Sequence, residues 1–161
     1  MLEHALPGKG GTIIETWSTR VAPARIEDAD SNALQINGYN EQEWAGAPSF
    51  ASIADDVAKR LAGASVICGH NVGFDVQFIE AAFARLGRKV RMPYHKVDTV
   101  TLAYCAWHTD TNEPGPGLSL DKLRRLLGIS LNGGHSALKD AQDARRVYYE
   151  ALGKLTGNSL W

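Results

Sequence analysis

The feature that most constrains the fold is a short apolar run that leads directly into a helical pattern. Residues 64–69, Ala-Ser-Val-Ile-Cys-Gly, are typical of a buried β-strand. The apolar residues that follow predict a helix whose buried face holds Phe74, Phe78, Ile79, Ala82 and Leu86. A strand followed by a helix is typical of an α/β sheet, which binds ligands beyond the carboxyl ends of its strands. Asp75 lies at such an end, and an acid among apolar side chains is costly unless a cation pairs with it.

The N-terminal third predicts a hairpin, a long connection and a helix. Residues 11–21 alternate between two faces and are rich in β-branched side chains, which predicts a strand. Leu2 to Leu6 predict a short partner strand, joined through the turn-forming residues 7–11. Residues 22–48 are predicted to be an irregular connection. Pro48-Ser49 then opens a helix with apolar positions at Phe50, Ile53, Ala54, Val57, Ala58 and Leu61.

Asp98 and Ser119 each have two interpretations. Residues 97–99 resemble a brief strand that turns into a helix, so Asp98 is either the N-cap of that helix, which we favour, or an acid near the ligand site. Ser119 follows a clear loop at residues 108–117 and is best explained as a helix N-cap. With Lys122 it also matches the Ser-x-x-Lys pattern of acyl-transfer enzymes, which leaves a hydrolase of another class as a distant alternative.

A histidine and an aspartate lie close together in the sequence at the start of the last predicted helix. His135 follows Gly133-Gly134 and precedes Asp140 by five residues. The glycines give the histidine a loop, and the helix dipole favours a carboxylate in the first turn. Alone, this spacing fits metal-dependent chemistry or a loop histidine beside a helix-capping acid. The helix is predicted from Ala137, with an apolar stripe at Ala141, Ala144, Tyr148, Ala151 and Leu155.

The composition limits the classes of protein that fit. A chain of 161 residues suits one domain, so residues 1–161 are predicted to form a single unit. The net charge of −1 argues against a protein that coats nucleic acid by bulk electrostatics, but allows an enzyme that holds one strand end. Two basic clusters are expected to be solvated surface: Arg85, Arg88, Lys89, Arg91 and Lys96, and then Lys122, Arg124 and Arg125.

The cellular location and the state of the cysteines are predicted from the same sequence. No apolar run reaches the roughly 20 residues that span a bilayer, and the first residues lack the pattern of a signal peptide. We therefore expect a cytoplasmic protein without a membrane partner. Cys68 and Cys105 lie in apolar segments without Cys-x-x-Cys spacing, and we expect both to be reduced thiols in the core.

Taken in order, these motifs resemble those of a known enzyme family. The chain has His-Asn-x-x-Phe-Asp at residues 70–75, Ser-Leu-Asp at residues 119–121 and His-x-x-x-x-Asp-Ala at residues 135–141. Together they resemble the DEDDh, or DnaQ-like, family of 3′ to 5′ exonucleases in the ribonuclease H-like superfamily. The resemblance extends over roughly residues 1–155. It implies an α/β ribonuclease H-like fold, in which a mixed sheet, antiparallel at first and then parallel, is flanked by helices.

The resemblance also implies a reaction and its site residues. Members of the family hydrolyse phosphodiester bonds with two divalent ions, usually Mg²⁺ or Mn²⁺, and hard cations of this kind take carboxylate oxygens. Carried over by motif, Asp75 and Asp140 would be metal ligands and His135 the general base. Residues that would contact the substrate or support the ligands are His70, Asn71, Phe74 and Asp98. The expected partners are a single-stranded 3′ end of DNA or RNA and a DNA polymerase.

The chain departs from the family pattern at its start. Family members begin with an apolar strand that carries Asp-x-Glu, and no such motif is present here. Leu2 to Leu6 correspond to the second strand, so the usual first strand, which lies between the second strand and the one ending at Gly69, is expected to be lacking. The sequence therefore predicts either an N-terminally truncated reading frame or a homologue with a depleted active site. The alternative function is a catalytically inactive module that binds nucleic-acid ends or a polymerase partner.

Overall fold

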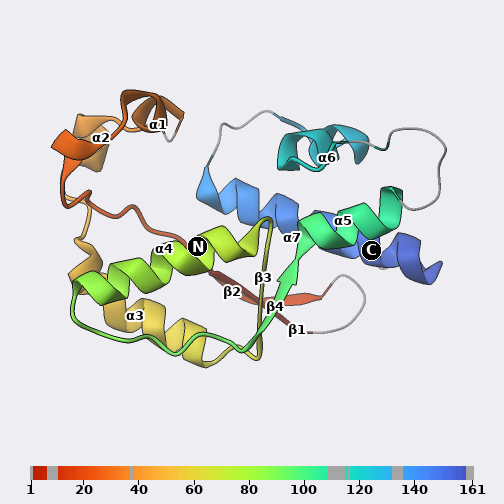
Figure 1. Ribbon diagram of the computed structural model, residues 1–161, viewed down its shortest axis with the longest axis horizontal. Helices are drawn as coiled ribbons and strands as arrows, with labels where there is room; N and C mark the ends of the chain where they lie inside the picture. The colour runs from red at the N-terminus through yellow and green to blue at the C-terminus, as the bar shows by residue number, and fades with distance from the viewer. Residues whose placement is uncertain are drawn as a thin grey trace.

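The computed structural model describes residues 2–6, 11–36, 38–108, 115, 117–131 and 136–158, with residues 2–6 and residue 36 described by their backbone alone. In chain order the elements are β1 (Leu2–Leu6), β2 (Thr12–Trp17), the 3-10 helix η1 (Ile26–Asp28), α1 (Ser31–Ile36), α2 (Glu41–Trp44), α3 (Phe50–Ala62), β3 (Val66–Gly69), α4 (Val72–Arg85), β4 (His95–Asp98), α5 (Thr99–Trp107), α6 (Leu120–Leu126) and α7 (Ala137–Thr156). This alternation of strands and helices confirms the predicted α/β class (Figure 1).

The strands pair in both directions, as predicted, but they form two small sheets. β1 runs antiparallel to β2, with Leu2 opposite Trp17, which confirms the hairpin. β3 runs parallel to β4, with Gly69 opposite Asp98. Within the described residues no backbone hydrogen bonds join the two sheets. The strand that the resemblance places between them is not among these residues.

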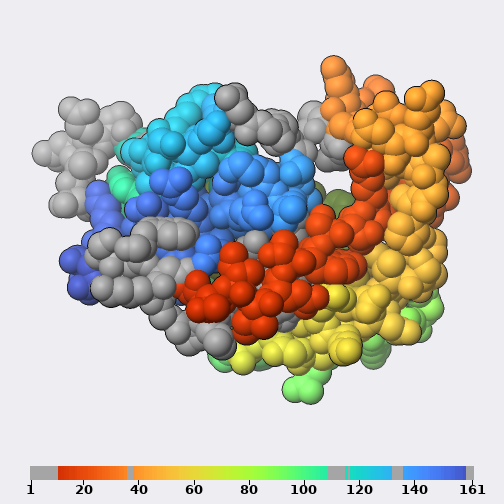
Figure 2. All heavy atoms as spheres, turned by 180° about the vertical axis from the view of Figure 1, so that it is seen from behind, coloured from red at the N-terminus to blue at the C-terminus, as the bar shows by residue number. Residues whose placement is uncertain are grey.

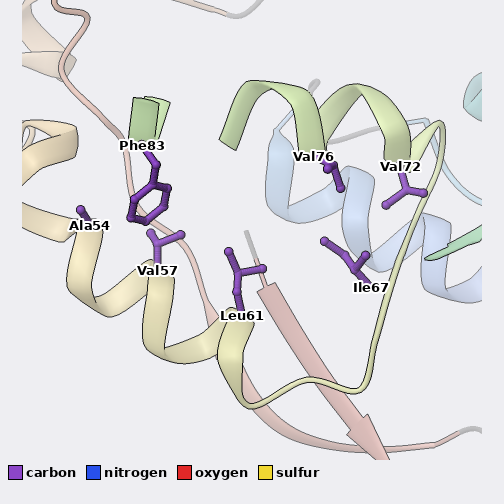
Figure 3. Close-up of a cluster of buried hydrophobic side chains, with 7 residues drawn as sticks. All are labelled: Ala54, Val57, Leu61, Ile67, Val72, Val76 and Phe83. Atoms are coloured by element: carbon purple, nitrogen blue, oxygen red, sulfur yellow. The ribbon is translucent and has the colours of Figure 1, made fainter. Parts of the chain in front are cut away.

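Two apolar clusters hold the helices in place. The larger one joins α3, β3 and α4, whose side chains point toward one another in Figure 3. Its buried members are Ala54, Val57, Leu61, Ile67, Val72, Val76 and Phe83. The smaller cluster joins α5, α6 and α7 through Ala103, Leu123 and Val147. These clusters fix the positions of α4, α6 and α7, the helices that carry the candidate site.

The buried face of α4 differs from the predicted face. The buried residues are Val72, Val76 and Phe83, and the wrongly predicted ones are Phe74, Phe78 and Leu86. Ile79 does pack against the larger cluster, as predicted. The helix carries apolar residues on more than one side, so helical spacing alone does not select the face that meets α3 and β3.

The predicted helix starts are largely confirmed by their caps. Ser49 Oγ accepts a hydrogen bond from the Ser52 N–H at the start of α3, and Ser136 caps α7 in the same way. Ser119 occupies the N-cap position of α6, but its side chain makes no capping hydrogen bond. The predicted connection over residues 22–48 contains three short helices, and β2 ends at Trp17 rather than at residue 21.

The buried stripe of α7 was predicted only in part. Ala144 and Ala151 are buried as predicted, whereas Leu155 is 46% exposed. Val147 provides the central contact with α5 and α6 instead. On the other side, the segment that contains β2 runs alongside α7 (Figure 2), and Arg145 Nη2 donates to the Gly11 carbonyl at 2.9 Å.

The cysteines and the helices test two further expectations. Among the described residues, neither Cys68 nor Cys105 forms a disulfide, and both are exposed, so their predicted burial was wrong. A short strand leaves Cys68 accessible because its neighbour Ile67 points into the core. Among the described residues, no helix has the length and apolar character needed to cross a membrane.

Candidate functional site

Asp98 joins the ends of the two parallel strands to the helices that follow them. Its Oδ1 accepts hydrogen bonds from the backbone N–H of Val100 at 2.9 Å and of Asn71 at 3.0 Å. Its Oδ2 accepts the N–H of Val72 at 3.0 Å. One carboxylate therefore satisfies donors at the starts of both α5 and α4, which have no partner within their own helices. The predicted N-cap role of Asp98 is confirmed, and it extends to a second helix.

His70 and Asn71 form the turn between β3 and α4. Asn71 has a φ of 61°, a left-handed conformation that asparagine tolerates better than most residues. His70 Nδ1 lies 2.9 Å from Oγ1 of Thr99, which is completely buried. Burial lowers the pKa of His70, and the negative charge of Asp98 opposes that shift. The lowered pKa favours the neutral imidazole near pH 7, where it can share a hydrogen bond with the hydroxyl.

Asp75 lies in the first turn of α4, just beyond the carboxyl end of β3, as predicted. Gly69 lies close to this turn: a Cβ added there would make a tight 3.3 Å contact with the Val72 side chain and an ordinary 3.6 Å contact with Asp75 Oδ2. Asp75 is an exposed residue, yet nearby protein atoms displace part of its hydration. This desolvation raises the pKa of Asp75, and the charge of Asp98 raises it further. Both effects favour a cation at this carboxylate.

An aromatic pair flanks Asp75 on the outer side of α4. Phe74 is 56% exposed and Phe78 is 64% exposed, and their ring centroids lie 4.5 Å apart. The resemblance implies a substrate contact for Phe74, and its exposure leaves the ring accessible to one. Phe78 lies one turn further along the helix and was predicted only as a core residue.

Asp140 lies in the first turn of α7, as predicted, where it pairs with an arginine of α6. Nη2 of Arg124 donates to Asp140 Oδ1 at 2.5 Å. Its Nη1 donates to Asp121 Oδ1 at 2.7 Å, and its Nε donates to Asp143 Oδ2 at 2.7 Å. All three donor positions of the guanidinium are thus engaged by carboxylates from α6 and α7.

The centre of this ion-pair cluster, Arg124 with Asp143, is buried, which strengthens the interaction between their charges. Arg124 and Asp143 are each 4% exposed, and Lys139 Nζ also pairs with Asp143. Burial acts to lower the pKa of Arg124, but the hydrogen bonds to Asp140, Asp121 and Asp143 raise it well above its ordinary value. The predicted solvation of Arg124 was therefore wrong.

Sequence reasoning missed the Arg124 cluster, although one signal for it was present. Arg124 follows Leu120 by four residues and precedes Leu127 by three, so it lies on the apolar side of α6. A charged residue there needs buried partners. The acids at Asp121, Asp140 and Asp143 were available, but their convergence depends on how α6 packs against α7, which local patterns do not reveal.

The described residues provide only part of the donor set of a divalent metal centre. Asp75 and Asp140 have the oxygen donors that Mg²⁺ and Mn²⁺ prefer. However, the described part of the chain contains no group of three or more His, Cys, Asp or Glu side chains that could hold an ion. Since Asp140 is also paired with Arg124, these residues by themselves do not fit the two-metal centre that the resemblance implies. His135, the predicted general base, lies outside the described residues.

The structure still relates the two halves of the predicted site. The charge of Asp98 raises the pKa of His70, that of Arg124 lowers it and that of Asp140 raises it, each less than burial lowers it. α7 also packs against β3. The helix that carries Asp140 therefore lies against the strand that leads into the motif at residues 70–75.

The fold and these motifs are those of a nuclease, and comparison with known proteins identifies the family. The family model described as an exonuclease, RNase_T, matches residues 5–148, so the chain belongs to this exonuclease family. It is 32% identical to DNA polymerase III subunit epsilon of Haemophilus influenzae over 144 residues, which cover 84% of this chain and 51% of that protein. The predicted DEDDh, DnaQ-like membership and the ribonuclease H-like fold are thereby confirmed.

Other relatives have related names and diverse lengths. The chain is 29% identical to DNA polymerase III subunit epsilon of Treponema pallidum, over 84% of this chain and 60% of that protein. It is 35% identical to Protein NEN1 of Arabidopsis thaliana, over 81% of this chain and 27% of that protein. The chain thus spans about half the length of the epsilon subunits that it matches.

Proposed function

We propose that this protein is a 3′ to 5′ exonuclease that removes nucleotides from single-stranded ends of DNA or RNA. The observation that carries the proposal is the position of Asp75, in the first turn of α4 at the carboxyl end of a parallel strand. Open α/β sheets bind their ligands at this edge. The exonuclease match over residues 5–148 supports the same chemistry. Residues 1–161 would act as one domain, in the cytoplasm.

The proposed cofactor is Mg²⁺ or Mn²⁺, with Asp75 and Asp140 among its ligands. Both side chains are carboxylates, which suit these hard cations. No third His, Cys, Asp or Glu joins them among the described residues, so the two carboxylates are proposed as part of the centre. His135 is the proposed general base for the attacking water, because the ordinary pKa of histidine, about 6.5, suits proton transfer near neutral pH.

Asp98, Asn71 and His70 have a supporting role in this proposal. Asp98 accepts hydrogen bonds from the N–H groups of Asn71 and Val72, where the turn enters α4. This turn sets the position of Asp75. His70 ties the same turn to Thr99 at the start of α5. These residues therefore keep Asp75 at the edge of the sheet, while the exposed Phe74 is available to the substrate.

The test is a cleavage assay on 5′-labelled single-stranded DNA and RNA with Mn²⁺. We expect a ladder of products shortened from the 3′ end, and loss of that ladder in Asp75→Asn and His135→Ala. Asp55→Asn is the matched control, because Asp55 is an exposed acid that pairs with Arg88 away from the site. Equal cleavage by Asp75→Asn and Asp55→Asn would contradict the assigned role of Asp75.

A second candidate function is favoured by the engagement of Asp140 with Arg124. A chain whose carboxylate is already paired would bind a nucleic-acid end, or a DNA polymerase, without cleaving it. Two relatives are named as subunits of a DNA polymerase, which supports a polymerase as the partner to test. This candidate predicts retention of a labelled 3′ end with no turnover at any Mn²⁺ concentration. Cleavage by highly purified protein that Asp75→Asn abolishes would exclude it.

A further inference from the structure

The carboxylate of Asp140 is bound by a cation that belongs to the chain itself. The guanidinium of Arg124, a buried residue of α6, lies 2.5 Å from Oδ1 of Asp140, a half-buried residue in the first turn of α7. The described residues contain no group of three or more side chains that could hold a metal ion, and Asp140 has this ion pair instead.

We propose that Arg124 is a resident counter-cation that competes with a divalent ion for Asp140, and so sets the metal affinity of the site. The inference rests on the proposed function only in taking Asp140 to be a metal ligand. It assigns a controlling role to a residue that lies outside the motifs at residues 70–75, 119–121 and 135–141.

The geometry holds Arg124 firmly in this place. Its Nε donates to Asp143 and its Nη1 donates to Asp121, each at 2.7 Å. Two hydrogen bonds therefore still hold the guanidinium if Asp140 turns away. The guanidinium is planar and its donors are fixed relative to one another, so these hydrogen bonds also fix the direction of Nη2. Asp140 is 41% exposed and can change its conformation, whereas the side chain of Arg124, at 5% exposed, is confined.

The charges of the cluster explain why competition is expected. Arg124 and Lys139 supply two positive charges against the three carboxylates of Asp121, Asp140 and Asp143. The cluster therefore retains one net negative charge, which attracts a cation. A divalent ion at Asp140 would be repelled by the nearby guanidinium, and its approach would break a short charge-assisted hydrogen bond.

The experiment measures Mn²⁺ binding directly, without nucleic acid. Removal of Arg124 alone would leave Asp143 buried with half its charge partners gone, so the comparison is made in an Asp143→Asn background. The test protein carries Arg124→Gln in that background. The matched control carries Arg125→Gln instead, which removes the same charge from the next, exposed residue of α6. Circular dichroism and thermal unfolding establish that each variant is folded.

We expect Arg124→Gln to strengthen Mn²⁺ binding by about tenfold or more, the effect of one charge about 5 Å from a divalent ion even at the dielectric constant of water. The control should change the affinity by less than about twofold, because an exposed charge is screened. Adding Asp140→Asn to the test protein should abolish the gain. Calorimetry or the electron paramagnetic resonance signal of free Mn²⁺ gives the readout.

Three outcomes would overturn the inference: unchanged or weaker binding in the Arg124 variant, an equal gain in the Arg125 control, or a gain that survives Asp140→Asn. Absence of binding in every variant would also overturn it, because the Arg124 variant should expose the site. The result is separable from the proposed function. Stronger binding without cleavage would support the role of Arg124 while contradicting the exonuclease, and cleavage without a change in binding would do the reverse.

Discussion

Replacing Asp98 by alanine should destabilise the fold more than the loss of an ordinary helix cap. The carboxylate accepts three backbone hydrogen bonds, from the N–H groups of Asn71, Val72 and Val100. Loss of an N-cap costs typically about 1 kcal/mol, and hydrogen bonds to charged groups contribute about 1.5–3 kcal/mol each. Asn71 is exposed, so its N–H can bind water when the carboxylate is removed. We therefore estimate the loss as that of two helix caps, with a small addition because the acceptor is charged. The expected loss is about 2–4 kcal/mol of unfolding free energy.

Urea unfolding followed by circular dichroism tests this magnitude. Asp98→Asn retains one acceptor oxygen and should lose about half as much, so the expected order of stability is wild type, Asp98→Asn and then Asp98→Ala. Asp30→Ala is the control, because Asp30 Oδ1 accepts a single N–H, from Ala33, at the exposed start of α1. It should cost about 1 kcal/mol or less. Equal losses for Asp98→Ala and Asp30→Ala would refute the idea that one carboxylate holds two helices.

Three further predictions concern the histidine, the corrected helix face and the serine. Burial lowers the pKa of His70, so the imidazole binds a proton more tightly in the unfolded chain than in the folded one. The free energy of unfolding should therefore fall as the pH drops from 7 to 5. In His70→Gln, urea unfolding over that range should depend less on pH. Phe83→Ala should cost about 3–5 kcal/mol because Phe83 is 1% exposed. Phe78→Ser should cost about 0.5 kcal/mol or less, and a larger loss would restore the originally predicted face. Ser119→Ala should leave nuclease activity unchanged in the cleavage assay, because Ser119 is the N-cap residue of α6. Loss of activity in this variant would support the Ser-x-x-Lys alternative.

The position of Asp75 could be predicted because it depends on local sequence alone. An apolar strand, a turn and a helix follow one another within residues 64–86, and the chain has no room to place Asp75 elsewhere. The same holds for the caps at Ser49 and Asp98, where the capping group and its donor are two or three residues apart. Asp98 also binds Asn71 and Val72, and this second contact spans 26 residues or more, so it was not foreseen.

The orientation of α4 could not be predicted because its sequence does not specify one face. Apolar residues occupy several sides, and the choice between Phe78 and Phe83 depends on Phe50 of α3, which meets Phe83 at a ring distance of 5.2 Å. Arg124 is hidden for a similar reason. Its partners lie 3, 16 and 19 residues away, so only the packing of α6 against α7 brings them together.

The two predicted metal ligands, Asp75 and Asp140, therefore differ in the charges that surround their carboxylates. Asp75 loses part of its hydration and lies near another carboxylate, so the arrival of a cation relieves an existing cost. Asp140 is half-buried and already forms an ion pair with the guanidinium of Arg124, so a cation there must replace a favourable contact. The family motif treats these two aspartates as equivalent carboxylates. If both bind a cation, we expect Asp75 to attract it first and the affinity of Asp140 to depend on the ion pair with Arg124.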